Sequence, residues 1–472
     1  MEAFLNTLSN IFGAFGSGII IPIILFVLSK AMGVDTKKAF NSALLCGVGL
    51  TGFNLVINSY SGVIAPVVQS MVDNTGIKLS TIDTGWQSTS IIAYSTTVGV
   101  LFIGVAIALQ LILFFVGFTD VFMASDLWNN YSFMVWGSML YALTGNMLLA
   151  MALMVCQLFY ILLFSEMCAL RWGTYYEYDG CCMTAPHHLE SFPFTVLMDW
   201  ILTKLGFNKI KINASDLQKK LGLLGEPMMI GLFVGLLIGL IGEAPFLFGE
   251  NALTAWGTAL GVAINTAAIM AVFPKVAAIF ASAFTSMSDA YKSRAAASAK
   301  ERRWFLSVND ACGYGETNTL VTGVLLIPIM LVLAFIMQPL GNNVLPMADL
   351  CALPYMVEVF VCVSNGNIAK SVVMGAIWFG LGLILFSQLA PTFTQVAVGT
   401  GQFTVPEGAL NVCSFGIVCH PFMIALFYAF WKGGVVAIAV LVVLYVVLYV
   451  WFRKNKQKVY DYLENNAAAY KA

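Results

Sequence analysis

The sequence predicts an all-α polytopic membrane protein with about eleven transmembrane helices, and three observations lead to this fold class. The chain of 472 residues is 60% hydrophobic and only 10% charged, whereas a soluble domain carries about 25% charged residues. Apolar runs near the length of about 20 residues that a spanning helix needs recur along the whole chain. These runs are continuous and do not alternate with polar residues, which excludes a β-barrel.

The apolar runs set the expected spans. They lie near residues 17–33, 43–66, 91–117, 131–144, 147–166, 228–243, 252–273, 319–337, 349–364, 371–389 and 434–452. A further apolar segment, Val405–Trp431, is interrupted by two prolines and two glycines. We expect this segment to be partly inserted or extracellular.

Lysine and arginine residues fall almost entirely on one side of this span plan. They follow spans one, five, seven, nine and eleven, and the densest groups are at 204–220, 292–303 and 453–458. Cytoplasmic loops carry an excess of such residues. The plan therefore places the N-terminus outside and the C-terminus in the cytoplasm, which requires an odd number of crossings.

The chain contains an internal repeat. A first copy spans 1–166, a basic cytoplasmic linker follows at 167–222, and a second copy spans 223–390; the remainder, 391–472, holds the last span and a polar tail. Each copy reads as two spans, a polar tract, a span, a short span and another span. Because five spans form one copy, the second copy is expected to be inverted across the membrane.

The polar tract of each copy, Ser80–Ser90 and Val308–Asn318, immediately precedes a span. Backbone without helical hydrogen bonds is tolerated at membrane depth only where it is buried in protein or lines a cavity. Paired interruptions of this kind point to a transporter's binding site. We expect two re-entrant hairpins whose acidic tips, at Asp83 and Asp310, meet near the midplane. Two ordinary loops are the alternative.

Several blocks resemble a known family. They are Asp83-Thr84-Gly85-Trp86, Pro186-His187, Gly225-Glu226-Pro227 and Asn342-Asn343-Val344-Leu345-Pro346. Together they are similar to the galactitol-type membrane component (enzyme IIC) of the bacterial phosphoenolpyruvate-dependent sugar phosphotransferase system. The resemblance implies a fold related to the ascorbate permeases, a homodimer, an elevator motion of a core domain, and soluble IIA and IIB partner subunits. It also implies a multi-pass protein of the bacterial plasma membrane.

Intramembrane carboxylates are costly and mark functional sites. Asp83, Asp310 and Glu316 are therefore the first candidates for contact with a substrate. Carboxylates accept hydrogen bonds from hydroxyl groups strongly, which suits a polyol. The other candidate substrate-binding residues are neighbouring polar or aromatic groups or are suggested by the resemblance: Trp86, Gln87, Ser88, His187, Glu226, Thr317 and Asn318. Trp86 as an interfacial aromatic and Glu226 as a helix-start residue are the structural alternatives.

No cofactor and no metal ion are predicted. His187 and His188 have Cys181, Cys182 and Glu190 nearby, but the spacing is loose for the three or four converging ligands that a metal requires. No Walker motif occurs, so the chain is not expected to hydrolyse ATP, and no nucleic-acid partner is expected.

We therefore expect a sugar-alcohol permease that delivers its substrate to a phosphorylated IIB subunit and is not an enzyme on its own. The main alternative is an ion-coupled secondary transporter of a small carbohydrate or organic solute, since midplane acids can also bind H⁺ or Na⁺. A membrane-embedded enzyme and a passive channel are weaker alternatives. The chain lacks a nucleophile-and-base set, and an acid pair on hairpins suits alternating access.

Overall fold

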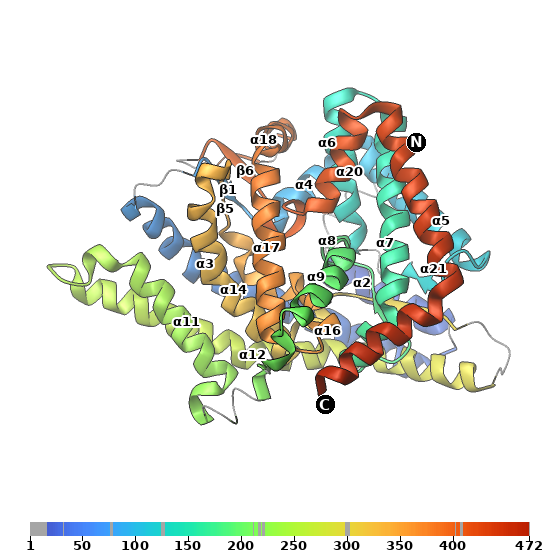
Figure 1. The fold of residues 1–472 in the computed structure, drawn as a ribbon, viewed down its shortest axis with the longest axis horizontal. Helices are drawn as coiled ribbons and strands as arrows, with labels where there is room; N and C mark the ends of the chain where they lie inside the picture. The colour runs from blue at the N-terminus through green and yellow to red at the C-terminus, as the bar shows by residue number, and fades with distance from the viewer. Residues whose placement is uncertain are drawn as a thin grey trace.

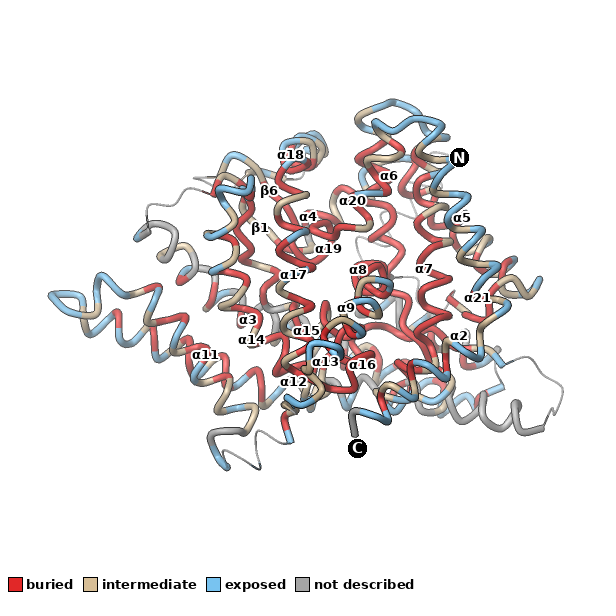
Figure 2. The backbone as a smooth tube through the Cα atoms, in the orientation of Figure 1, coloured by how far each residue is buried: buried red, intermediate tan, exposed pale blue. Residues whose placement is uncertain are grey.

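The computed structural model describes residues 17–31, 33–75, 79–123, 128–210, 212–215, 219, 222–297, 303–401, 403–405 and 409–471. Helices dominate, and the strands are short (Figure 1). The most buried backbone lies in the middle of the molecule, whereas helices at its two sides expose much of their surface (Figure 2).

The elements follow a repeating order. The first half contains α2 (Ser17–Ala31), α3 (Thr36–Thr75), β1 (Thr81–Asp83), α4 (Trp86–Ser95), α5 (Thr97–Phe115), β2 (Val121–Phe122), α6 (Tyr131–Thr144), α7 (Met147–Tyr175), β3 (Cys181–Met183), α8 (Pro186–Leu189) and α9 (Phe192–Lys204). The second half contains α11 (Pro227–Gly242), α12 (Ala252–Ala297), β4 (Phe305–Val308), α13 (Ala311–Tyr314), α14 (Thr317–Ile336), β5 (Val344–Leu345), η7 (Ala348–Ala352), α15 (Leu353–Met356), α16 (Glu358–Val363), α17 (Ile368–Ser387), α18 (Ala390–Gly399), β6 (Asn411–Cys413), α19 (Phe415–Val418), α20 (Pro421–Trp431) and α21 (Gly434–Lys471).

Six of the described helices are long and apolar enough to cross a membrane: α5, α7, the part of α12 up to Val276, α14, α17 and α21 up to Ala469. Each coincides with an expected span, so the polytopic membrane class is confirmed, while the total of eleven spans stays a prediction. The expected span at 349–364 is divided among η7, α15 and α16. Pro354 lies at the start of α15, where its fixed φ angle suits the first turn of a helix.

The strands form two small parallel sheets that exchange partners between the two halves. In one sheet β1 lies between β5 and β6; in the other β4 lies between β2 and β3. Each polar tract therefore begins with a strand that pairs only with strands of the opposite half in the described chain. A non-helical segment inside a membrane protein would otherwise leave its backbone N–H and C=O groups unpaired, and strand pairing supplies their hydrogen bonds.

The two halves continue to follow the same order of elements beyond residues 166 and 390, the expected ends of the two copies. The series β3, α8 and α9 in the first half corresponds to β6, α19 and α20 in the second. The segment expected to be partly inserted or extracellular thus contributes a strand to a central sheet. Its residues Cys413, Phe415 and Cys419 are fully buried, so it belongs to the core.

A four-helix group consists of α2, α3, α11 and α12, in which α3 contacts the other three helices and α11 also packs along α12. Gly231, Gly235 and Gly239 form a face of α11 that packs closely against α12. A Cβ atom added to Gly239 would lie 2.6 Å from the Cα of Ala259 in α12. Small residues let two helix backbones approach to this degree.

The last helix, α21, bends at Asn455, whose backbone is non-helical. Just before and after the bend, Arg453 and Lys456 form ion pairs with the buried acids Asp120 and Glu166. The polar end of α21 is therefore fixed to the first half of the chain, and it runs toward the middle of the molecule (Figure 1).

Candidate functional site

Parallel pairing of β3 and β4 brings two chemically active segments together. The register aligns Met183 with Val308. Asp310 follows β4 by two residues and precedes α13, while β3 leads into α8, which carries His187 and His188. Because parallel strands end at the same edge of a sheet, the carboxylate and the two imidazoles converge there.

The site consists of Asp310, His187 and His188 with two polar neighbours, Asn129 in the turn before α6 and Ser132 in the first turn of α6. The Nε2 atoms of His187 and His188 lie 3.3 Å and 3.1 Å from Oδ2 of Asp310. Asn129 Nδ2 donates to Oδ1 of Asp310 at 3.5 Å. Ser132 Oγ lies 3.2 Å from Nδ1 of His187. All five residues are buried.

His188 is incompletely satisfied. Its Nε2 lies 3.1 Å from Oδ2 of Asp310, whereas its Nδ1 has no hydrogen-bond partner within the described chain, although the side chain is fully buried. A buried polar group without a partner costs free energy. His188 is therefore the group at this site with the most hydrogen-bonding capacity left for a ligand.

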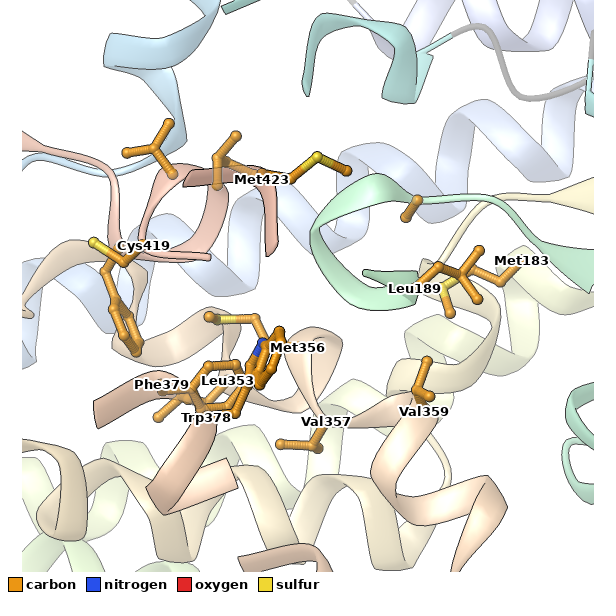
Figure 3. Close-up of a cluster of buried hydrophobic side chains, with 14 of the residues drawn as sticks. Met183, Leu189, Leu353, Met356, Val357, Val359, Trp378, Phe379, Cys419 and Met423 are labelled. Atoms are coloured by element: carbon orange, nitrogen blue, oxygen red, sulfur yellow. The ribbon is translucent and has the colours of Figure 1, made fainter. Parts of the chain in front are cut away.

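Apolar side chains surround α8 on the side of the second half. Figure 3 shows Leu189 and Met183 near this short helix, with Met356 and Val357 from α15 and its end, and Met423 from α20. Helix α8 also contacts α6, α7, α16 and α19. This dense packing fixes the histidine-bearing turn, and a low-dielectric surrounding strengthens any polar contact made inside it.

The acid of the first tract, Asp83, has a different environment. Its Oδ1 accepts from the backbone N–H groups of Gly85 and Phe415, and its Oδ2 accepts from those of Met347 and Asp349, all at 2.7–3.0 Å. These four donors come from three separate segments. Asp83 thus joins β1 to the two segments that flank it, and its side chain is saturated by the protein itself.

A second buried acid, Asp349, continues this arrangement. It accepts from the backbone N–H of Trp86 and of Gly416 and from the hydroxyl group of Ser414. It therefore anchors the first turn of α4, at the tip of the first polar tract, to the turn before α19.

The two acidic tracts are connected through α19 and α8. His420 Nε2 lies 2.9 Å from the carbonyl oxygen of Gly416, and its Nδ1 lies 2.8 Å from Oε1 of Glu190. The rings of His420 and His187 are 6.4 Å apart between centroids. Asp83 and Asp310 make no hydrogen bond to each other in the described chain. The contacts of His420 with Gly416, Glu190 and His187 connect the surroundings of the two acids.

The remaining predicted residues of the second tract act mainly on local structure. Glu316 caps α14, because its carboxylate accepts from the backbone N–H groups of Asn318 and Thr319. Asn318 also binds the hydroxyl of Tyr175 and the backbone of Ala214. Thr317 is exposed at the first turn of the helix. Within the described chain, none of these three residues makes a hydrogen bond to Asp310 or to the two histidines.

The predicted residues of the first tract and the linker are dispersed. Ser88 is buried and donates to the carbonyl of Gly85, and Trp86 is half-buried at the start of α4. The side chain of Gln87 lies outside the described part of the structure. Glu226 precedes α11 without capping it through its side chain. Of the predicted set, the structure brings together Asp310 and His187.

Sequence reasoning missed several members of the network. Glu190 accepts from Trp378 Nε1 and from the backbone N–H of Met423, and Glu358, fully buried, accepts from Trp172 Nε1. Both acids lie in segments that were not recognised as polar tracts. Asp349 is a third such acid and lies three residues after the Asn342–Pro346 block. The signal that could have identified it is the presence of an acid at the start of an apolar run.

The three donor groups also fit the ligand types of a metal ion. One ligand atom each from His187, His188 and Asp310 lies within 4.8 Å of the others. Two imidazoles and a carboxylate suit several transition metals. The same set also forms a hydrogen-bonding site, since a neutral imidazole offers one donor and one acceptor and a carboxylate offers several acceptors.

Comparison with known proteins assigns the chain to a class. Residues 10–408 match the family described as "PTS system sugar-specific permease component". The "PTS system galactitol-specific EIIC component" of Escherichia coli K12 is 27% identical over 389 residues, which cover 82% of this chain and 83% of that protein; its counterpart in strain O157:H7 matches equally. The "Putative permease IIC component" of strain K12 is 27% identical over 403 residues, covering 85% and 89% of the two chains.

Proposed function

The chain belongs to the sugar-specific permease components of the phosphotransferase system, and we propose that its substrate is a galactitol-like polyol held at His187, His188 and Asp310. As a permease component it is a multi-pass membrane protein and not an enzyme on its own. Phosphorylation is the task of a IIB partner subunit, and IIA supplies IIB. Relatives described as galactitol-specific support the choice of a sugar alcohol.

One observation carries the position of the site: two acids in corresponding places of the two tracts differ in how far the protein satisfies them. Asp83 accepts four backbone hydrogen bonds. Asp310 lies instead among side chains, one of which, His188, has a ring nitrogen, Nδ1, without a hydrogen-bond partner in the described chain. A substrate hydroxyl can donate to Asp310 and accept from His188, which would satisfy both groups.

The chemistry of the set suits an uncharged ligand with many hydroxyl groups. Asp310 provides an acceptor, Asn129 and Ser132 provide groups that donate or accept, and each histidine can do either. Trp86, on the opposite tract, offers an aromatic surface for the C–H groups of the substrate. The other predicted residues surround these groups in the proposal and hold the two tracts in position.

The packing supports a division into a scaffold and a mobile part. Helices α2, α3, α11 and α12 contact one another more than they contact the rest, and we propose that they form the dimer scaffold of a homodimer. The remainder, with both tracts, would move as a core and carry the substrate between the two sides of the membrane. We also propose that the two tracts are re-entrant, that the second half repeats the first in inverted orientation, and that the chain crosses the membrane eleven times.

Phosphorylation would also favour release. A phosphate monoester carries about −1.5 to −2 charges at neutral pH. Near Asp310 this charge is repelled, and the charged product cannot recross the membrane unaided. Transport therefore needs no ion gradient in this scheme.

The Asp310→Asn variant tests the site. The amide keeps the shape of the side chain but removes the charge, and hydrogen bonds to charged groups contribute about 1.5–3 kcal/mol each. We expect the dissociation constant for galactitol, measured by calorimetry on the purified protein, to rise at least tenfold while the thermal unfolding temperature stays near that of the wild type. Unchanged binding would remove Asp310 from the site. Asp461→Asn, the same substitution at an exposed position of α21, serves as the control.

Ion-coupled transport is the alternative function, and the cluster of three ligand atoms favours it. Proteoliposomes that contain only this chain distinguish the two. Group translocation predicts no accumulation in response to a proton or sodium gradient, and accumulation of phosphorylated substrate once IIA, IIB and a phosphoryl donor are enclosed. Gradient-driven accumulation without those subunits would support the alternative.

A further inference from the structure

An apolar groove opens where α21 bends, away from the site described above. It has a volume of about 360 Å³ and lies between α7, α9 and α21. Two polar residues of α21, Asn455 and Lys458, line it, and the rest of the lining is apolar or aromatic and includes Phe164, Trp451, Val459 and Tyr462. The volume falls within the range of roughly 300–1,000 Å³ that is common for ligand sites.

Lys458 distinguishes this groove from an ordinary gap between helices. Of the basic residues near the bend, Arg453 and Lys456 are paired with Asp120 and Glu166. Lys458 is exposed and has no ion pair among the described residues. The only cation in the described lining of the groove is therefore available to an anion from outside the chain.

The position along α21 places this cation at a boundary. The helix is apolar from Gly434 to Phe452 and becomes basic at Arg453–Lys458. Trp451 and Tyr462, both in the lining, are 49% and 40% exposed. Aromatic residues beside a basic segment mark the level of the lipid headgroups.

We propose that this groove binds an anionic glycerophospholipid, with an acyl chain along the apolar lining and the phosphate group at Lys458. Basic pockets between helices on the cytoplasmic side are suited to anionic lipid headgroups. The apolar walls require a hydrocarbon group and the unpaired ammonium requires a negative charge, and this class of lipid carries both. The site lies in α7, α9 and α21, outside the four-helix group.

Native mass spectrometry of the purified full-length protein, with phosphatidylglycerol or phosphatidylcholine added to the detergent, tests the proposal. We expect preferential retention of phosphatidylglycerol by the wild type. Lys458→Gln should reduce that retention about fivefold, which corresponds to the interaction of one basic residue with an anionic membrane lipid. Lys454→Gln is the matched control, because Lys454 is also exposed and unpaired in the described chain but does not line the groove.

A second variant, Val459→Trp, fills the groove without changing the charge. It should lower the retention of phosphatidylglycerol and abolish the rise in thermal unfolding temperature that this lipid gives the wild type. Equal retention of both lipids, equal losses in Lys458→Gln and Lys454→Gln, or a disulfide cross-link between two copies of a Val459→Cys variant through the introduced thiol would overturn the proposal. The last result would assign the groove to a second copy of the chain.

Discussion

Asp83 and Asp310 occupy corresponding places in the two polar tracts but serve different purposes. Both are buried, and burial of a carboxylate requires compensation. For Asp83 the backbone provides it through four N–H donors. For Asp310 the neighbours are side chains, two of them histidines. The same residue type thus stabilises a junction in one half and offers chemistry in the other.

Asp83→Asn should lower the stability of the protein and have little direct effect on substrate binding. The amide nitrogen of asparagine faces two N–H donors whose hydrogen bonds one carboxylate oxygen accepted, so both hydrogen bonds are lost and both contacts become repulsive. We expect a loss of about 2–4 kcal/mol in the free energy of unfolding, seen as a lower thermal unfolding temperature in detergent. Asp310→Asn, which should unfold normally, is the comparison. A stable Asp83→Asn protein with weakened substrate binding would instead place Asp83 in the site.

At the scale of elements, backbone contact between α11 and α12 depends on glycine. A Cβ atom on Gly239 meets the backbone of Ala259 at 2.6–3.1 Å, and one on Gly235 meets the hydroxyl of Thr266 at 2.5 Å. Interiors are close-packed and adjust only partly to added volume. The glycine face therefore determines how closely α11 and α12 approach each other.

Gly239→Ala should destabilise the protein even though alanine favours helices by about 1 kcal/mol over glycine. The added methyl group must separate the two helices, at a cost of about 1–3 kcal/mol. Gly261→Ala in α12, where a Cβ atom has no neighbour within 4 Å, is the matched control and should be neutral or stabilising. Thermal unfolding of the two variants measures the difference. Equal effects would show that the close approach contributes nothing.

The exchange of strands between halves belongs to the same scale. Because β1 pairs with β5 and β6, and β4 pairs with β2 and β3, neither half of the described chain completes a sheet by itself. Long-range pairing of this kind pays its loop-closure entropy before contacts form. The two halves are therefore not independent domains.

At the scale of the whole molecule, the distribution of lysine and arginine predicts how the chain lies in the membrane. A C-terminus in the cytoplasm follows from the basic groups at 204–220, 292–303 and 453–458 because cytoplasmic loops are enriched in these residues. Green fluorescent protein fused after Ala472 should be fluorescent in Escherichia coli. Alkaline phosphatase at the same position should be inactive, because it requires export.

The N-terminus offers the complementary measurement. With an odd number of crossings, a cysteine introduced near Met1 should react with a membrane-impermeant maleimide from the outside, while one near Ala472 should not. Labelling of both ends, or of neither, would indicate an even number of crossings and would contradict the plan of eleven spans.

The sequence by itself determined the membrane class, the positions of the long spans and the two polar tracts with their acids. These features are local: a run of apolar residues or an acid within such a run is visible without knowledge of its neighbours. Asp310 was identified for this reason, whereas His187 was suggested by the family resemblance. The resemblance to the phosphotransferase permeases was likewise carried by short contiguous blocks, and the family match confirms it.

Only the tertiary structure decided which residues share a site. The parallel register of β3 with β4 joins His187 and His188 to Asp310, across a separation in sequence that no local pattern encodes. The structure also separated Asp83, saturated by backbone donors, from Asp310, and it assigned Glu316 to a helix cap. The reason is physical: hydrogen-bond saturation depends on which segments meet in space, whereas hydrophobicity is a property of each segment alone.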